Sequence, residues 1–144
     1  MLVHQILKSK ASAEVVTIGP DASVADAAKV LSLRKIGSVV VSSNGKTADG
    51  ILSERDIVRE VGVRGAGCLT ETVGNMMTRD LVTCGPDESA DKVLMQMTEG
   101  RFRHMPVVQD GEMIGLITLG DAVKARLQEV SMEKEALEGM IMGF

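Results

Sequence analysis

Aromatic side chains are almost absent from this sequence. Among its 144 residues there is no tryptophan, no tyrosine and only two phenylalanines. Modules that bind single-stranded nucleic acid stack the bases on aromatic side chains, so this scarcity weighs against a nucleic-acid partner. The formal net charge of -4 at pH 7 points the same way, because the chain has no general basic field to attract nucleic acid or an anionic membrane.

Cysteine and histidine, which are common metal ligands, are also scarce. Cys68 and Cys84 are too few for a disulfide framework or a CxxC knuckle, and His4 and His104 are far apart in the sequence. The sequence therefore predicts no metal site. No hydrophobic run approaches the ~20 residues that cross a bilayer, and the first residues lack the pattern of a secretory signal. We therefore expect a cytoplasmic protein without a membrane partner.

The chain contains an internal duplication. Residues 16–23 (VTIGPDAS) recur as residues 82–89 (VTCGPDES), with six of the eight positions identical. Two further pairs of blocks keep the same order: residues 50–56 with 115–121, and residues 36–41 with 103–108. Three ordered pairs indicate that the two halves of the chain are repeats of one structural unit.

Each repeat has the same expected order of elements. A β-branched run meets a Gly-Pro-Asp turn, a helix with one apolar face follows, and two short strands lead to a second helix. The strands are expected at residues 15–18, 39–41 and 51–52, and again at 81–83, 106–108 and 114–117. The pattern predicts an α+β fold of two β-α-β-β-α repeats. Their bounds are residues 1–66 and 67–144, with an extended C-terminal helix in the second and a glycine-rich loop at residues 62–68.

The most informative segments are the two that carry a hydroxyl and, three residues later, a carboxylate. Ser53 precedes Asp56, and Thr118 precedes Asp121, each at an expected junction between strand and helix. One interpretation is a helix capping box. The other is recognition of a ligand, because a carboxylate accepts hydrogen bonds from the two hydroxyls of a ribose and a helix start binds anions. The two interpretations are compatible.

In this order, the blocks V-T-x-x-P-D, H-M-P-V-V and G-x-x-T-x-x-D resemble the cystathionine β-synthase (CBS) domain family. Two copies in one chain resemble a tandem CBS pair, or Bateman module, of the stand-alone bacterial type. The resemblance implies two repeats packed with pseudo-twofold symmetry, and two clefts between them that bind adenosine compounds such as AMP, ATP, NAD(H) or S-adenosylmethionine. It also implies sensing rather than catalysis.

The resemblance assigns residues to each cleft. The first cleft would contain Thr17, Gly37, Ser38, Ser53, Arg55 and Asp56. The second would contain Thr83, Arg103, His104, Met105, Pro106, Thr118 and Asp121. In this assignment the aspartates bind ribose, with the hydroxyl of Ser53 or Thr118 beside them, and the strand-entry residues read the adenine.

The two clefts are not expected to be equivalent. Arg55 precedes the first aspartate and could face phosphate, whereas Gly120 holds the corresponding position in the second repeat. Arg103 and His104 would then have to supply the missing cation. The second departure is that Gly37-Ser38-Val39 stands where the second repeat has His-Met-Pro.

The sequence therefore predicts a regulatory module that binds AMP, ATP or NAD(H) and signals by a shift between conformations. The alternative is a ligand-free structural or interaction module that scaffolds a partner. An enzyme is not expected, because no phosphate-binding loop, nucleophile elbow or metal set is present. A homodimer is expected, because Val30, Leu33 and Met95 are apolar positions outside the faces that the repeats share.

Overall fold

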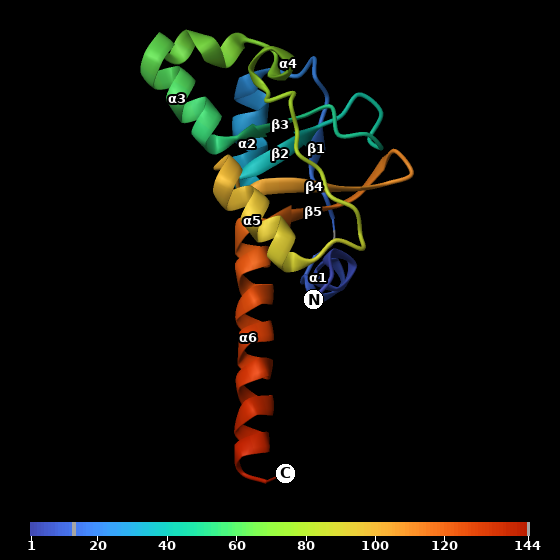
Figure 1. Ribbon diagram of the computed structural model, residues 1–144. Helices are drawn as coiled ribbons and strands as arrows, with labels where there is room; N and C mark the ends of the chain where they lie inside the picture. The colour runs from blue at the N-terminus through green and yellow to red at the C-terminus, as the bar shows by residue number, and fades with distance from the viewer. Residues whose placement is uncertain (13, 144) are drawn as a thin grey trace. The chain divides into compact units, whose positions relative to one another are not determined.

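The computed structural model describes residues 1–12 and 14–143, and its elements follow the expected order (Figure 1). The first part of the chain forms α1 (Val3–Ser9), β1 (Thr17–Ile18), α2 (Val24–Arg34), β2 (Ser38–Val41), β3 (Gly50–Ser53) and α3 (Glu54–Arg64). A 3-10 helix, η1 (Ala66–Thr70), comes next. The second part forms α4 (Val73–Met76), α5 (Ala90–Gly100), β4 (His104–Gln109), β5 (Glu112–Thr118) and α6 (Leu119–Ile141). The α+β class and the two repeats are thus confirmed.

The chain folds into two compact units, each with its own hydrophobic core. The β1–β3 unit consists of Glu14–Val82 and Asp110–Ile114. The β4–β5 unit consists of Met1–Ala13, Thr83–Gln109 and Gly115–Phe144. The short helix that leads into each repeat therefore belongs to the unit built from the other repeat: α1 lies in the β4–β5 unit and α4 in the β1–β3 unit.

The β1–β3 unit is built on a three-stranded sheet in the order β1-β2-β3. β1 runs parallel to β2, and β2 runs antiparallel to β3 with Ser38 opposite Ser53. Every residue of β2 is buried, which suits its run of three valines, because a strand covered on both faces reads as a continuous apolar segment. The apolar face of α2 and Val73 of α4 complete this core.

The β4–β5 unit contains a two-stranded sheet. The strand expected at residues 81–83 is reduced to a single parallel bridge between Cys84 and Val107. α1 is attached to the Gly-Pro-Asp turn, because the His4 N–H donates to the Pro86 carbonyl at 2.9 Å and the Val3 N–H donates to the Glu88 carbonyl at 2.8 Å. Leu7 of the same helix contacts β5 at Gly115, where a larger residue would collide with it.

The duplication extends to the helix caps. Ser23 and Ser89 accept hydrogen bonds from the third residues of α2 and α5, at 3.1 and 3.2 Å. The same two helices end at Lys35 and Arg101, whose φ angles of 54° and 57° lie in the left-handed region. Each pair is 66 positions apart, so the two helices begin and end in the same way.

The structure corrects the alignment of the third repeated block. Val41 is the partner of Ile18 in one unit, and Val107 is the partner of Cys84 in the other, so the strands correspond at an offset of 66. The sequence blocks had been aligned at 67. Ser38, rather than Gly37, therefore occupies the position of His104. A shift of one residue inverts the two faces of a strand, and only the hydrogen-bonded register can reveal it.

The glycine-rich segment at residues 62–68 is mostly helical, so the expected loop is wrong. Gly62 lies within α3, and the 3-10 helix starts at Ala66. Arg64 links the end of α3 to the residue that follows η1, because its guanidinium donates to Glu60 at 2.7 Å and to both carboxylate oxygens of Glu71, at 2.9 and 2.7 Å. These contacts lower the pKa of the Glu71 carboxyl and raise the pKa of Arg64. They support the end of α3 and the start of the next segment.

Replacing Lys35 with glycine is expected to stabilise the protein. A side chain disfavours the left-handed conformation that ends α2, and glycine adopts it freely, so Lys35→Gly should raise the free energy of unfolding by about 1 kcal/mol. Lys29→Gly, at an exposed position inside the same helix, is the control and should lower it by about 1 kcal/mol. Chemical denaturation measures both, and a loss of stability in Lys35→Gly would contradict the argument.

Candidate functional site

Both segments that carry a hydroxyl and an acid form capping boxes at helix starts. At α3 the Ser53 hydroxyl accepts from the Asp56 N–H at 3.2 Å, and the Asp56 carboxylate accepts from the Ser53 N–H at 3.0 Å. At α6 the same two bonds join Thr118 and Asp121, at 3.1 and 2.9 Å. The capping interpretation is therefore confirmed twice, with aspartate in the place of the more usual glutamate.

Each capping box is joined to the start of the neighbouring strand. The Glu54 N–H donates to the Gly37 carbonyl at 2.9 Å, and the Leu119 N–H donates to the Arg103 carbonyl at 2.8 Å. In each unit the strand-entry segment, the hydroxyl and the acid thus lie together. We call these clusters the first site, in the β1–β3 unit, and the second site, in the β4–β5 unit.

The remaining candidates of the first site lie at its edge. Thr17 is exposed on β1 and pairs with Val40, while Ser38 is 6% exposed at the start of β2. Arg55 is exposed on the first turn of α3 and makes no ion pair within the described residues. The cation that contacts the acid is instead Arg59, whose Nη2 donates to Asp56 Oδ1 at 2.9 Å. Sequence reasoning missed it, although the spacing of three residues on one helix was a usable signal.

The candidate residues of the second site differ in how accessible they are to a ligand. Thr83 and Arg103 are exposed, and His104 is half-buried. Met105 is fully buried in the core and Pro106 is buried beside it. A ligand could therefore meet Met105 only through its backbone atoms.

Lys10 is the second residue that sequence reasoning missed. It follows α1, and its Nζ lies 2.8 Å from Asp121 Oδ2 while donating to the Leu116 carbonyl at 2.9 Å. Burial of Asp121 raises the pKa of its carboxyl, but the hydrogen bonds from Lys10 and Thr118 outweigh this, so the pKa is lowered. No sequence pattern could have found the pair, because its members come from opposite ends of the chain.

Both cysteine thiols are buried. Burial, with a smaller contribution from Glu88, raises the pKa of the Cys84 thiol to about 12, so it packs as a small apolar residue. Within residues 1–12 and 14–143, no three His, Cys, Asp or Glu side chains are placed to share a metal ion. The same residues include no helix that is both long and apolar enough to span a membrane.

The Lys10–Asp121 pair should stabilise the protein at neutral pH and lose this effect in acid. Because the folded state lowers the pKa of Asp121, the stabilisation is complete above the ordinary aspartate pKa of about 3.9 and disappears as the pH falls through the folded value. Lys10→Met should lower the free energy of unfolding by about 1 kcal/mol at pH 7, and by much less near pH 2. Urea denaturation at both pH values tests this.

Arg59→Met is the matched control for that experiment. Its ion pair with Asp56 is solvent-screened, since the Arg59 side chain is 64% exposed, so its removal should have the smaller effect. Equal losses for Lys10→Met at both pH values would mean that Lys10 stabilises the fold through packing and its bond to the Leu116 carbonyl rather than through Asp121.

Comparison with known proteins identifies the CBS domain family. A model of the CBS domain matches the chain twice, at residues 4–63 and 73–128. The mitochondrial CBS domain-containing protein CBSX3 of Arabidopsis thaliana is 32% identical over 148 residues, which cover 98% of this chain and 72% of that protein. The chain spans only about a quarter of the length of two further relatives from the same plant, CBSCBSPB2 and CBSCBSPB3.

Solved structures are similar over most of the chain. The CBS-domain protein ATU1752 of Agrobacterium tumefaciens is 42% identical with a TM-score of 0.82, covering 88% of this chain and 99% of that one. The CBS pair of protein MJ0100, in complex with 5-methylthioadenosine and S-adenosyl-L-methionine, is 25% identical with a TM-score of 0.77 and covers 90% and 98%. A hexameric CBS-CP12 protein from bloom-forming cyanobacteria is 28% identical with a TM-score of 0.73, covering 85% and 69%.

Adenosyl ligands and oligomeric assembly thus both occur among proteins similar to this one. The two family matches fall on the two repeats, and each repeat contributes one capping box beside a strand entry. The chain belongs to the CBS domain family as a tandem CBS pair, and this family is regulatory rather than catalytic.

Proposed function

We propose that the chain is a regulatory module that binds adenosine-containing ligands such as AMP, ATP or NAD(H) at its two sites. The observation that carries the proposal is the placement of a half-buried aspartate beside a strand entry in both units. A carboxylate there can accept hydrogen bonds from ribose hydroxyls while its own helix start remains capped. The binding of two adenosine compounds by the MJ0100 pair supports the same ligand class.

Within this proposal the site residues keep the roles expected from the sequence. Asp56 and Asp121 accept from ribose, and the positive ends of the α3 and α6 helix dipoles attract an anion. Arg55 is exposed at the first of these helix starts, and Arg103 is exposed beside the second. A cation at either place attracts the phosphate of a nucleotide but adds little for adenosine.

Signalling requires that the ligand bind one conformation better than another. The β4–β5 unit has a feature suited to this, because Lys10 joins the segment after α1 to the aspartate that would bind ribose. A ligand that changes this contact would change how residues 1–12 are held. The cytoplasmic location expected from the sequence stays a prediction.

Removing the carboxylate charge of either site should weaken ligand binding at that site. Asp56→Asn and Asp121→Asn should each weaken the corresponding site at least about tenfold for AMP, because a hydrogen bond to a charged acceptor is replaced by a weaker neutral one. Isothermal titration calorimetry with AMP, ATP and NADH measures this. Asp26→Asn, a first-turn acid of α2 outside both sites, is the control and should leave binding unchanged.

The same ligands should also raise the melting temperature. A ligand at 100 times its dissociation constant adds about 2.7 kcal/mol to the free energy of unfolding. If none of the three ligands binds or shifts the melting temperature, the ligand-free interaction module that scaffolds a partner is the better description.

We further propose that the chain forms a homodimer. Of the three positions expected to need cover, Leu33 and Met95 are 83% and 55% exposed, whereas Val30 packs against its own core. α6 adds a second apolar surface, because only Ala122 and Ala125 of this helix are buried and its C-terminal half extends beyond α5 (Figure 1). Exposed apolar side chains in this number favour burial against a second copy.

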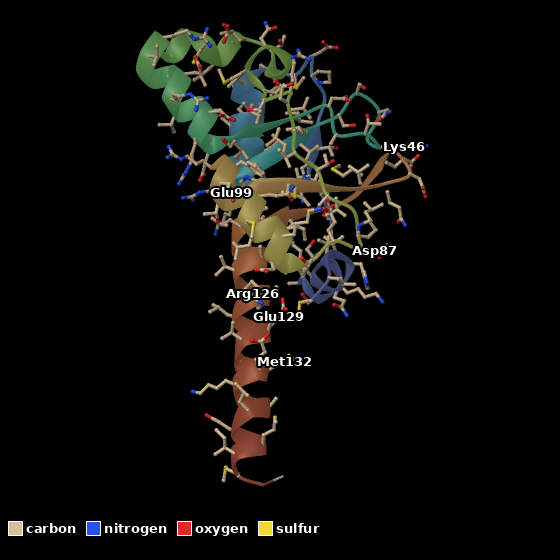
Figure 2. The ribbon with its side chains drawn as sticks, in the orientation of Figure 1. Lys46, Asp87, Glu99, Arg126, Glu129 and Met132 are labelled. Carbon is tan, nitrogen blue, oxygen red and sulfur yellow. The ribbon has the colours of Figure 1, made fainter. Side chains whose placement is uncertain are left out.

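Sedimentation at micromolar protein concentration is expected to show a dimer. The double variant Leu33→Glu with Met95→Glu should sediment as a monomer, because two charges would have to be buried at each copy of the interface. Glu99→Gln, a change at an exposed position of α5, is the control (Figure 2). A monomeric wild-type chain would overturn the proposal.

A further inference from the structure

Lys10 is held at the second site by two hydrogen-bonding partners. Its Nζ lies 2.8 Å from Asp121 Oδ2 and donates to the Leu116 carbonyl at 2.9 Å. Its side chain is only 23% exposed. Its backbone is also held in place, because the preceding helix α1 packs into the core of the same unit through Val3 and Ile6. The ammonium group is therefore a fixed part of the second site.

One oxygen of Asp121 is fully used. Oδ2 receives both the Lys10 ammonium and the Thr118 N–H, at 2.8 and 2.9 Å. A carboxylate oxygen has two lone-pair positions, so Oδ2 has no capacity left for a ligand hydroxyl. Oδ1 has no hydrogen-bond partner among residues 1–12 and 14–143. Only Oδ1 can accept from a ligand while Lys10 stays in place. The bidentate contact, in which two neighbouring ribose hydroxyls each donate to a different carboxylate oxygen, is therefore blocked at Asp121.

Asp56 at the first site is arranged differently. Among the described residues, its Oδ2 accepts only the Ser53 N–H, at 3.0 Å, and its Oδ1 accepts only Arg59, at 2.9 Å. Arg59 is 64% exposed and comes from the same helix, so its side chain can turn into solvent at little cost. Each oxygen of Asp56 therefore keeps capacity for one hydroxyl of a ribose.

We infer that Lys10 is a specificity-determining residue of the second site. Because of Lys10, the second site binds one ribose hydroxyl, whereas the first site binds both. The inference rests on the proposed binding of ribose by Asp56 and Asp121. The second site would then accept a deoxyribose that the first site rejects. A ligand that needs both oxygens of Asp121 must displace Lys10 from the Asp121 carboxylate and from the Leu116 carbonyl. This cost lowers the affinity of the ligand.

The test compares adenosine with 2′-deoxyadenosine and 3′-deoxyadenosine by calorimetry, since these uncharged ligands avoid any effect of Lys10 on a phosphate. Asp121→Asn leaves the first site intact, and Asp56→Asn leaves the second. At the first site both deoxynucleosides should bind at least about tenfold more weakly than adenosine. At the second site one of them should bind within about threefold of adenosine.

Adding Lys10→Met to Asp56→Asn should free Oδ2. Adenosine should then bind more tightly, and both deoxynucleosides should show the tenfold loss of the first site. Lys10→Gln removes the charge with a smaller change in polarity, and it serves as a second variant if Lys10→Met folds poorly. Lys8→Met, which alters an exposed lysine of α1, is the matched control and should change nothing.

The possible results separate this inference from the function on which it rests. If wild-type protein and both single-site variants bind none of the three nucleosides and none of AMP, ATP and NADH, the proposed function and the inference fail together; binding of AMP without binding of any nucleoside overturns the inference alone. If adenosine binds but Lys10→Met leaves the discrimination unchanged, or weakens adenosine, the inference alone is overturned. In this last case Lys10 would be a structural residue or a direct contact of the ligand.

Discussion

The structure depends on the acceptors that the first backbone N–H groups of α3 and α6 find outside their own helices. The first N–H groups of a helix have no acceptor within it, and at both helices an aspartate and a hydroxyl supply acceptors reciprocally. One further N–H at each start, from Glu54 or Leu119, donates to the carbonyl of the residue just before β2 or β4. Strand entry and helix start are therefore fixed to each other, and the position of the aspartate follows from both.

This constraint explains why one short segment can serve two purposes. A carboxylate has more acceptor capacity than a cap requires, so an aspartate that caps a helix can still bind a cation or a ligand hydroxyl. Arg59 uses the spare capacity of Asp56, and Lys10 uses that of Asp121. The structural and the functional interpretations of these segments are thus consequences of one arrangement.

The two repeats share their caps and helix ends but differ in what surrounds the acid. Arg59 comes from the same helix as its aspartate, whereas Lys10 comes from the segment that precedes the first repeat. Both units receive the lead-in helix of the other repeat. In the β4–β5 unit the residue that follows this helix is Lys10, which contacts Asp121. Duplicated sequence therefore produced two similar sites with different electrostatic surroundings.

Local patterns in the sequence determined the duplication, the order of strands and helices, the apolar faces and the two capping boxes. These features depend on residues a few positions apart, as Ser53 and Asp56 are, so periodicity and spacing reveal them. The same patterns could have revealed Arg59. Glycine is a poor helix former, so these patterns favoured a loop at residues 62–68, whereas the structure places Gly62 inside α3.

Tertiary structure alone decided the strand register, the single bridge at Cys84 and the pairing of Lys10 with Asp121. The local sequence of a strand fits several neighbouring registers almost equally well, and packing against the partner strand selects one of them. Lys10 and Asp121 meet because α1 packs into the core formed by the second repeat. Neither residue carries a local signal of the other, since contacts between distant segments are fixed by packing rather than by spacing along the chain.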